Sequence, residues 1–144
     1  MMLSAARNTP QAAGDLREGA VAASAVIYAG ALVMRNAAGF LVKATEVTGL
    51  VGAGRAEETV DNSSGANGDK SLRFRPGVFR FANSSGADEI TAADIGALCY
   101  AVDDETVAKT SNTNARSAAG TVEMIDANGV WVRLDSAMTL AATV

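Results

Sequence analysis

Short apolar runs alternate with clusters of turn residues along the chain, a pattern typical of an antiparallel β domain. The first turn cluster, Asn36-Ala37-Ala38-Gly39, separates the run 27–35 from an apolar run that restarts at 40–42. We expect these two runs to pair as a β-hairpin. The first run is expected to place three large side chains on one face: Tyr28, Leu32 and Met34.

A second hairpin is predicted near the end of the chain. Runs 121–125 and 130–134 flank Asp126-Ala127-Asn128-Gly129, whose Asn-Gly pair tolerates the positive φ of a tight turn. Within the second strand Val130, Val132 and Leu134 share one face, because side chains alternate along a strand. Trp131 lies on the other face, so it belongs either to a second core or to an interface.

The middle of the chain offers a third candidate hairpin, in which Asp103-Asp104-Glu105 joins runs 97–102 and 106–110. In the run 72–82, Pro76-Gly77 interrupts alternating apolar residues. An ordinary Pro-Gly pair in a two-residue loop would splay its flanking strands, so we favour an edge strand with a local kink over a tight hairpin. Thr91 to Asp94 resembles the cap of a single helical turn.

The pentapeptide Asn-Ser-Ser-Gly-Ala occurs twice, at 62–66 and 83–87. The residues that flank the two copies differ completely. Because these residue types are the ones that turns select, we interpret both copies as polar turns and not as a duplicated module.

Together these elements predict a mainly β fold: a small antiparallel β-barrel or sandwich built from hairpins, with at most one or two short helical turns and extended termini. We expect an N-terminal arm at 1–17, a single β-rich domain at 18–135 and a C-terminal tail at 136–144. Neither terminal segment has a strong periodic pattern. Each is therefore a candidate to become ordered on a neighbouring molecule, with simple disorder as the alternative.

Composition limits the core and the choice of partners. Apolar residues form 49% of the 144 residues, but 30 residues are alanine and only seven are aromatic, so partner contacts would add useful burial. The net charge is −4 with 12 basic residues spread along the chain, which argues against a nucleic-acid partner. The uncharged stretch 19–34 is too short and too rich in small residues for a membrane helix, and no signal peptide is visible.

The chain has little equipment for chemistry. It has no histidine, and its single cysteine, Cys99, is expected to be a buried small hydrophobe. Segments 65–71 and 52–57 only superficially resemble nucleotide-binding loops, because an Asp or Glu stands where each pattern requires glycine. We interpret the acidic groups as solvated loop charges, and we expect no catalytic, cofactor or metal site.

Three segments carry a resemblance to a known family. The run Phe74-Arg75-Pro76-Gly77-Val78-Phe79-Arg80-Phe81, the segment Ile90 to Gly96, and the strand Ala97-Leu98-Cys99-Tyr100-Ala101-Val102 followed by Asp103-Asp104 occur in this order. Their order and spacing resemble those of the capsid decoration, or cement, proteins of tailed bacteriophages. The likeness extends more loosely over residues 20 to 135. The insert 61–70 and the polar stretch 111–120 depart from it, so contacts made by these loops are not carried over.

The resemblance implies a structural virion protein that binds the outer surface of the assembled phage head and stabilises it, without enzymatic activity or cofactors. It implies assembly in the host cytoplasm and two partners, the major capsid protein and the chain itself, as a homotrimer. The alternative is a non-catalytic β-rich binding module or another minor virion component, with Trp131 or Tyr100 at the contact. An enzyme would need an unrecognised carboxylate site. The candidate interface residues are Arg7, Pro10, Arg17 and Trp131.

Overall fold

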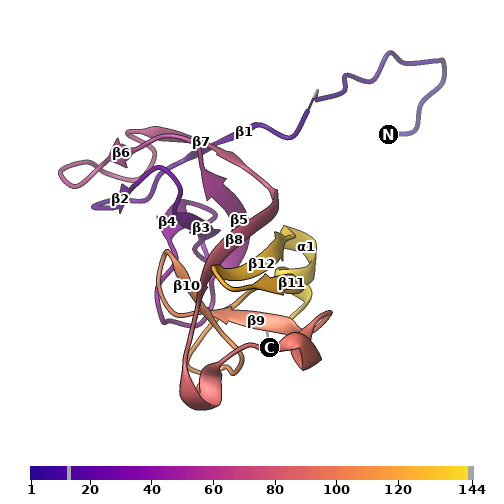
Figure 1. Cartoon of the computed structure of the whole chain (residues 1–144). Coiled ribbons are helices and arrows are strands. Elements are labelled where there is room, and N and C mark those ends of the chain that lie inside the picture. The colour runs from indigo at the N-terminus through magenta and orange to yellow at the C-terminus, as the bar shows by residue number, and fades with distance from the viewer. Residues whose placement is uncertain (13, 143–144) are drawn as a thin grey trace.

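Two β units lie side by side in the computed structural model, which describes residues 1–12 and 14–142 (Figure 1). One unit is a five-stranded sheet and the other is a closed five-stranded barrel. The prediction of a mainly β fold with a small barrel is therefore confirmed. The helical elements within the described residues are two single 3-10 turns, η1 (Gly86–Asp88) and η2 (Ala92–Asp94), and the helix α1 (Ser136–Ala141).

The N-terminal sheet is antiparallel throughout and almost closes on itself. Its order is β1 (Arg17–Ala20), β7 (Ser71–Arg75), β5 (Val51–Ala56), β3 (Leu32–Arg35) and β4 (Leu41–Lys43). An isolated bridge between Val21 and Leu41 joins the chain after β1 to β4, the opposite edge of the sheet. A separate pair, β2 (Val26–Ile27) and β6 (Val60–Asp61), lies beside this sheet (Figure 1).

The barrel is formed by the second half of the chain. Its strands follow the order β10 (Thr106–Ala108), β8 (Gly77–Asn83), β12 (Gly129–Leu134), β11 (Ala118–Asp126) and β9 (Leu98–Ala101), and β9 pairs with β10 to complete the circle. Only the β10–β8 pair is parallel. Closure leaves the barrel without a free edge that could template aggregation.

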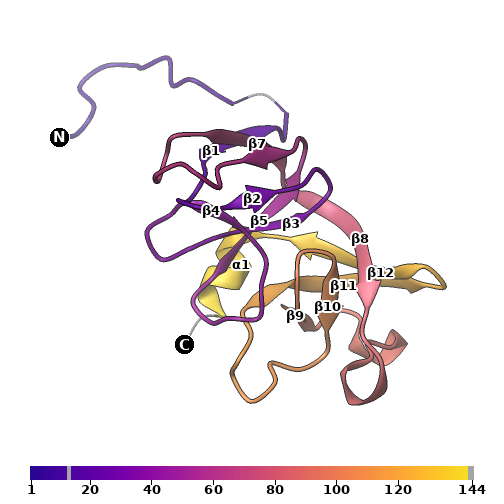
Figure 2. The same cartoon turned by 90° about the vertical axis from the view of Figure 1, so that its left-hand side faces the viewer.

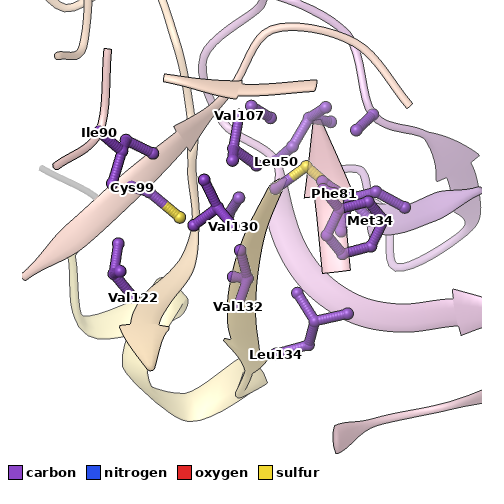
Figure 3. Packing of buried hydrophobic residues seen from close by; sticks show 14 residues of the cluster. Met34, Leu50, Phe81, Ile90, Cys99, Val107, Val122, Val130, Val132 and Leu134 are labelled. Atoms are coloured by element: carbon purple, nitrogen blue, oxygen red, sulfur yellow. The ribbon is translucent and has the colours of Figure 1, made fainter. Parts of the chain in front are cut away.

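Strand β3 contributes to both cores. Leu32 and Met34 are fully buried in the barrel cluster, whereas Val33 between them belongs to the cluster inside the sheet. Side chains of a strand alternate between faces, so β3 has an apolar core on each side and its three apolar side chains are buried. Figure 3 shows Met34 packed beside Phe81, Leu50 and the valines of the barrel strands. The shared strand therefore joins the two units through apolar packing.

All three predicted hairpins form. β3 pairs with β4 around 36–39, β9 with β10 around 103–105, and β11 with β12 around 126–129. One detail was wrong: Tyr28 is 61% exposed and does not share a face with Leu32 and Met34. The reason is Gly30, whose φ of 90° makes a turn between β2 and β3 and breaks the run 27–35 into two strands.

The kink at Pro76 is confirmed, but the edge position was wrong. β7 lies between β1 and β5, and β8 lies between β10 and β12, so both strands are interior strands. Pro76 has no backbone N–H to donate and falls between them. The chain uses this break to pass from the sheet into the barrel, so the predicted kink is the connection between the two units.

The two copies of the repeated pentapeptide differ in structure: 62–66 is a loop, as predicted, whereas 83–87 runs from the last residue of β8 into η1. Asn62 is 2% exposed, and its Nδ2 donates to the carbonyl oxygens of Ala22 (2.9 Å) and Ala66 (3.1 Å). Its buried Oδ1 has no hydrogen-bond partner and lies where a side chain at Gly65 would begin. The Asn83 side chain instead holds both backbone groups of Ile90.

Short helical elements follow local capping rules. The predicted turn at Thr91 to Asp94 is confirmed as η2, with a capping box in which the Asp94 carboxylate accepts from the Thr91 backbone N–H at 2.8 Å. Gly96 follows with a φ of 90°. None of the helices in residues 1–12 and 14–142 is long and apolar enough to cross a bilayer.

The C-terminal segment differs from the extended tail that was predicted. Residues 136–141 form α1, which begins after the N-cap Asp135 and packs on β5 and β11. Thr139 in this helix is fully buried. The last two residues of the predicted tail, 143–144, lie outside the described residues.

Candidate interaction surface

An extended N-terminal arm, defined here by its described residues 1–12 and 14–16, leaves the sheet unit and runs away from the body (Figures 1 and 2). All of its described residues are exposed, and none belongs to a helix or strand. Two of the predicted interface residues, Arg7 and Pro10, lie in this arm. The third, Arg17, is the first residue of β1 and the point where the arm begins.

The arm separates from the body because β7, the strand that it would pair with, ends at Arg75. In the β1–β7 register Arg17 is opposite Phe74, so continued pairing would bring the arm to Arg75 and then to Pro76. Proline offers no N–H for a ladder, and Pro10 and the positive φ of Gly14 (63°) also disfavour a continuous strand. Strand pairing therefore stops at Arg17.

An ion-pair network holds the root of the arm. Asp15 pairs with the Arg75 guanidinium, whose Nε also donates to Glu57 Oε1 at 2.7 Å. Arg55 Nη2 bonds the same carboxylate at 2.9 Å and stacks 4.3 Å from the centroid of the Phe79 ring. Arg75, and then Arg55, lower the pKa of Glu57 by hydrogen bonding to its charged form. The root is thus tied to the sheet and to the first barrel strand.

Arg17 makes local contacts only. Its Nη1 donates to the carbonyl oxygens of Gly14 (3.0 Å) and Leu16 (2.9 Å), and it forms no ion pair within the described part of the chain. Arg17 therefore shapes the exit of the arm while its charge remains without an acidic partner.

Trp131, the fourth predicted residue, lies half-buried on the outer face of the barrel. Its Nε1 donates to Asp126 Oδ2 at 2.7 Å, and the Arg80 guanidinium lies 5.6 Å from the ring centroid. The bond from Trp131 lowers the pKa of Asp126 by stabilising the carboxylate. Met124, opposite Trp131 in the ladder, is 51% exposed. Tryptophan, arginine and methionine are enriched at protein interfaces. Trp131 is half-buried and belongs to neither apolar core cluster, so the alternative core position is wrong.

A groove lies beside this face, between the β11–β12 turn and the segment that follows η1. Its volume is about 530 Å³, and we call it the acidic groove. Ile90 and Ile125 line it together with Ala82, and two exposed carboxylates, Glu89 and Asp126, also line it.

A second polar region surrounds Arg116, whose side chain is 9% exposed. Its Nε bonds Glu46 at 3.0 Å and its Nη1 bonds Asp88 at 3.1 Å, which joins the loop after β4 to the barrel. Thr110, and then Arg116, lower the pKa of Asp88. Asn112, Thr113 and Asn114 beside it all have positive φ. The Arg116 charge is therefore paired with two carboxylates, and these pairs connect the loop after β4 to the barrel.

Groups for chemistry are sparse in the region that the structure covers. Residues 1–12 and 14–142 contain no cluster of three His, Cys, Asp or Glu side chains that could hold a metal ion. Cys99 is buried as predicted, and burial raises the pKa of its thiol to about 12, so the thiolate is strongly disfavoured near neutral pH.

The four predicted interface residues do not form one patch on a single molecule. Arg7, Pro10 and Arg17 belong to the arm, while Trp131 lies on the barrel. Sequence reasoning missed Arg80, although its position between Phe79 and Phe81 placed it on the outer face of β8. Its contact with Trp131 requires the register of β8 against β12, which the sequence does not reveal. No protein-family model, curated protein or solved structure matches this chain.

Proposed function

We propose that this chain is a decoration protein of a tailed-phage head, which binds the outer surface of the assembled shell and stabilises it. The observation that carries the proposal is the exposed arm on a body that is already well packed without it. A 16-residue extended segment can span on the order of 50 Å, enough to reach a neighbouring subunit. The likeness of 74–104 to phage cement proteins supports the same function.

Stabilisation by such a protein requires no covalent step. A partner that binds only the assembled shell favours that shell by mass action, by about 2.7 kcal/mol at a free concentration one hundred times its Kd. In this proposal the major capsid protein is the main partner. The chain acts as a homotrimer on the virion surface, after assembly in the host cytoplasm, and has no enzymatic activity.

The test is co-sedimentation of the purified chain with expanded phage heads. We expect stoichiometric binding to expanded heads and little binding to unexpanded heads or free capsid subunits, because the complete site exists only on the expanded lattice. Heads carrying the protein should also withstand a higher temperature before releasing DNA. A soluble protein that ignores heads but is retained by immobilised glycans would support a binding module and contradict the proposal.

A further inference from the structure

The acidic groove and the arm carry opposite charges that have no ion-pair partners. Glu89 and Asp126 line the groove, and Glu105 lies next to it, because its carbonyl oxygen accepts from the Ala82 N–H at 2.7 Å. None of these three carboxylates belongs to an ion pair within residues 1–12 and 14–142. Arg80, on the adjoining face, lies over the Trp131 ring, and its charge also helps to lower the pKa of Asp126.

The charge of the groove is part of a larger asymmetry. Residues 77–144 carry four basic and nine acidic residues, a net charge of −5, whereas residues 1–76 carry eight basic and seven acidic residues, a net charge of +1. Most of the unpaired negative charge therefore belongs to the barrel half, where the groove is. Opposite potentials on two surfaces favour their association and fix the orientation of the contact.

The part of the arm before Asp15 carries the charge opposite to that of the groove. No acidic residue precedes Asp15, and Arg7 has no ion-pair partner among the described residues. The arm also exposes apolar side chains at Met1 to Leu3. Of the two isoleucines that line the groove, Ile125 is half-buried, whereas Ile90 is 2% exposed and belongs to the barrel core. The match between the two surfaces is therefore mainly one of charge.

The arm and the groove lie at opposite ends of the molecule. In both views the arm leaves at the top, while the segment with η1 and η2 lies at the bottom (Figures 1 and 2). For an arm to reach its own groove, it would have to reverse direction and cross the whole body. A second molecule can present its groove directly to the extended arm.

We propose that the arm of one copy docks into the acidic groove of a second copy, with the Arg7 guanidinium between Glu89 and Asp126 and with Trp131 at the margin. Arginine suits this place because its bonds to carboxylates are charge-assisted and because it can stack on an aromatic face. Arg7 and Pro10 of one copy then meet Trp131 of the other at one contact, while Arg17 remains in β1 at the root of the arm.

This contact is heterologous, because different surfaces of the two copies meet. Such contacts form a closed ring when the rotation between copies closes, and an open filament when it does not. The homotrimer expected for this chain would be a ring of three arm-to-groove contacts. The inference goes beyond head binding, and it can be tested on the purified protein without heads.

The experiment is a charge swap followed by analytical ultracentrifugation at low and high salt. We expect the wild-type chain to self-associate at low salt and to dissociate as salt screens the charges. Arg7→Glu and Glu89→Arg should each weaken association at least about tenfold. The double variant Arg7→Glu/Glu89→Arg should associate again, because every inverted arm in a ring of three then meets an inverted groove. Lys70→Glu, the same charge change at an exposed loop residue without an ion pair, should have no effect.

Several outcomes would overturn the inference. A wild-type chain that stays monomeric at low salt contradicts it, as does association that Arg7→Glu leaves unchanged or a double variant that stays monomeric. Weakening by Lys70→Glu equal to that by Arg7→Glu would show that net charge, and not the groove, controls association. Binding of monomers to expanded heads would leave the proposed function intact while overturning the arm-to-groove contact.

Discussion

The two ends of the described chain have similar sequences and opposite structures. Both are rich in small residues, and neither has a strong periodic pattern. Yet residues 1–12 and 14–16 extend with their side chains exposed, whereas residues 136–141 form α1 and bury Thr139 completely. The comparison shows that a weak pattern does not distinguish an arm from a docked segment. The difference is whether the folded body has polar groups that the segment can satisfy.

The body has such groups beside α1 but not beside the arm. A bulge in the β3–β5 ladder shifts the register between Val33 and Met34, and Gly52 lies next to it. The Gly52 N–H donates to Thr139 Oγ1 at 2.9 Å, and its carbonyl accepts from Ser136 Oγ at 2.6 Å. At the other end, the arm meets Pro76, which has no N–H. The C-terminal segment therefore satisfies the backbone N–H and C=O of Gly52, whereas the N-terminal arm meets no backbone N–H at Pro76.

The largest effect is expected from Thr139→Val, which breaks the contact between α1 and the bulge. The substitution keeps the side-chain volume but leaves the Gly52 N–H buried without an acceptor, a cost of about 1–3 kcal/mol in the free energy of unfolding. Urea denaturation measures this loss. Thr139→Ser retains the acceptor and should lose less. If both variants unfold at the wild-type midpoint, α1 is not held by this bond.

A smaller effect is expected from Asp135→Ala, which removes the N-cap of α1. The Asp135 carboxylate accepts from the backbone N–H groups of Ala137 (2.9 Å) and Met138 (3.2 Å). Loss of a cap of this kind costs about 0.5–2 kcal/mol. The unfolding midpoint in urea should fall, while Asp135→Asn, another good N-cap, should stay close to wild type. Equal losses in both variants would mean that the charge matters more than the cap.

Much of the fold could be predicted because its determinants are local. The turns at 36–39, 103–105 and 126–129 contain residues that select hairpins, and the cap at Thr91 is a four-residue motif. Apart from the overlooked local turn at Gly30, the failures involve distant partners. Pro76 revealed a break but not which sheets lie on either side of it, and the helix at 136–141 depends on a bulge more than 80 residues earlier in the chain.

The candidate site was less predictable for the same reason. The arm could be anticipated because it needs no partner within the chain, and Trp131 because strand alternation placed it opposite the core residues. The contact of Arg80 with Trp131, and the position of Glu89 in the groove, became visible only when β8, β12 and the loop after η1 were brought together. Surfaces formed by several elements cannot be derived from the spacing of residues in one of them.

Acid should weaken the ion pairs at the root of the arm. The contact between Thr139 and Gly52 contains no titratable group, so it should not respond to pH. The pKa of Glu57 is lowered in the folded state by Arg75 and Arg55, so its contribution to stability is present above the unfolded value of about 4.3 and is lost as pH falls through the folded pKa. The pair is near the surface, so the contribution is small, in a range of about 0–1 kcal/mol.

The measurement for this prediction is the free energy of unfolding of wild type and Glu57→Gln between pH 7 and pH 3. The difference between them should shrink as pH falls below about 4, because the wild-type carboxylate becomes protonated. Glu105→Gln, at an exposed position without an ion pair, serves as the control and should follow wild type throughout. A difference that grows in acid would contradict this role of Glu57.

The smallest effect on stability, and the sharpest contrast with α1, is expected from deletion of residues 1–12. This deletion spares Asp15, so the ion pair with Arg75 and the β1–β7 ladder both remain. Because the deleted side chains are exposed, the free energy of unfolding should stay within about 0.5 kcal/mol of wild type. Occupancy on expanded heads, measured by co-sedimentation, should nevertheless fall, because the lost contacts are contacts with neighbours. Unchanged occupancy would show that the body alone binds the shell, whereas a large loss of stability would mean that the arm belongs to the folded core.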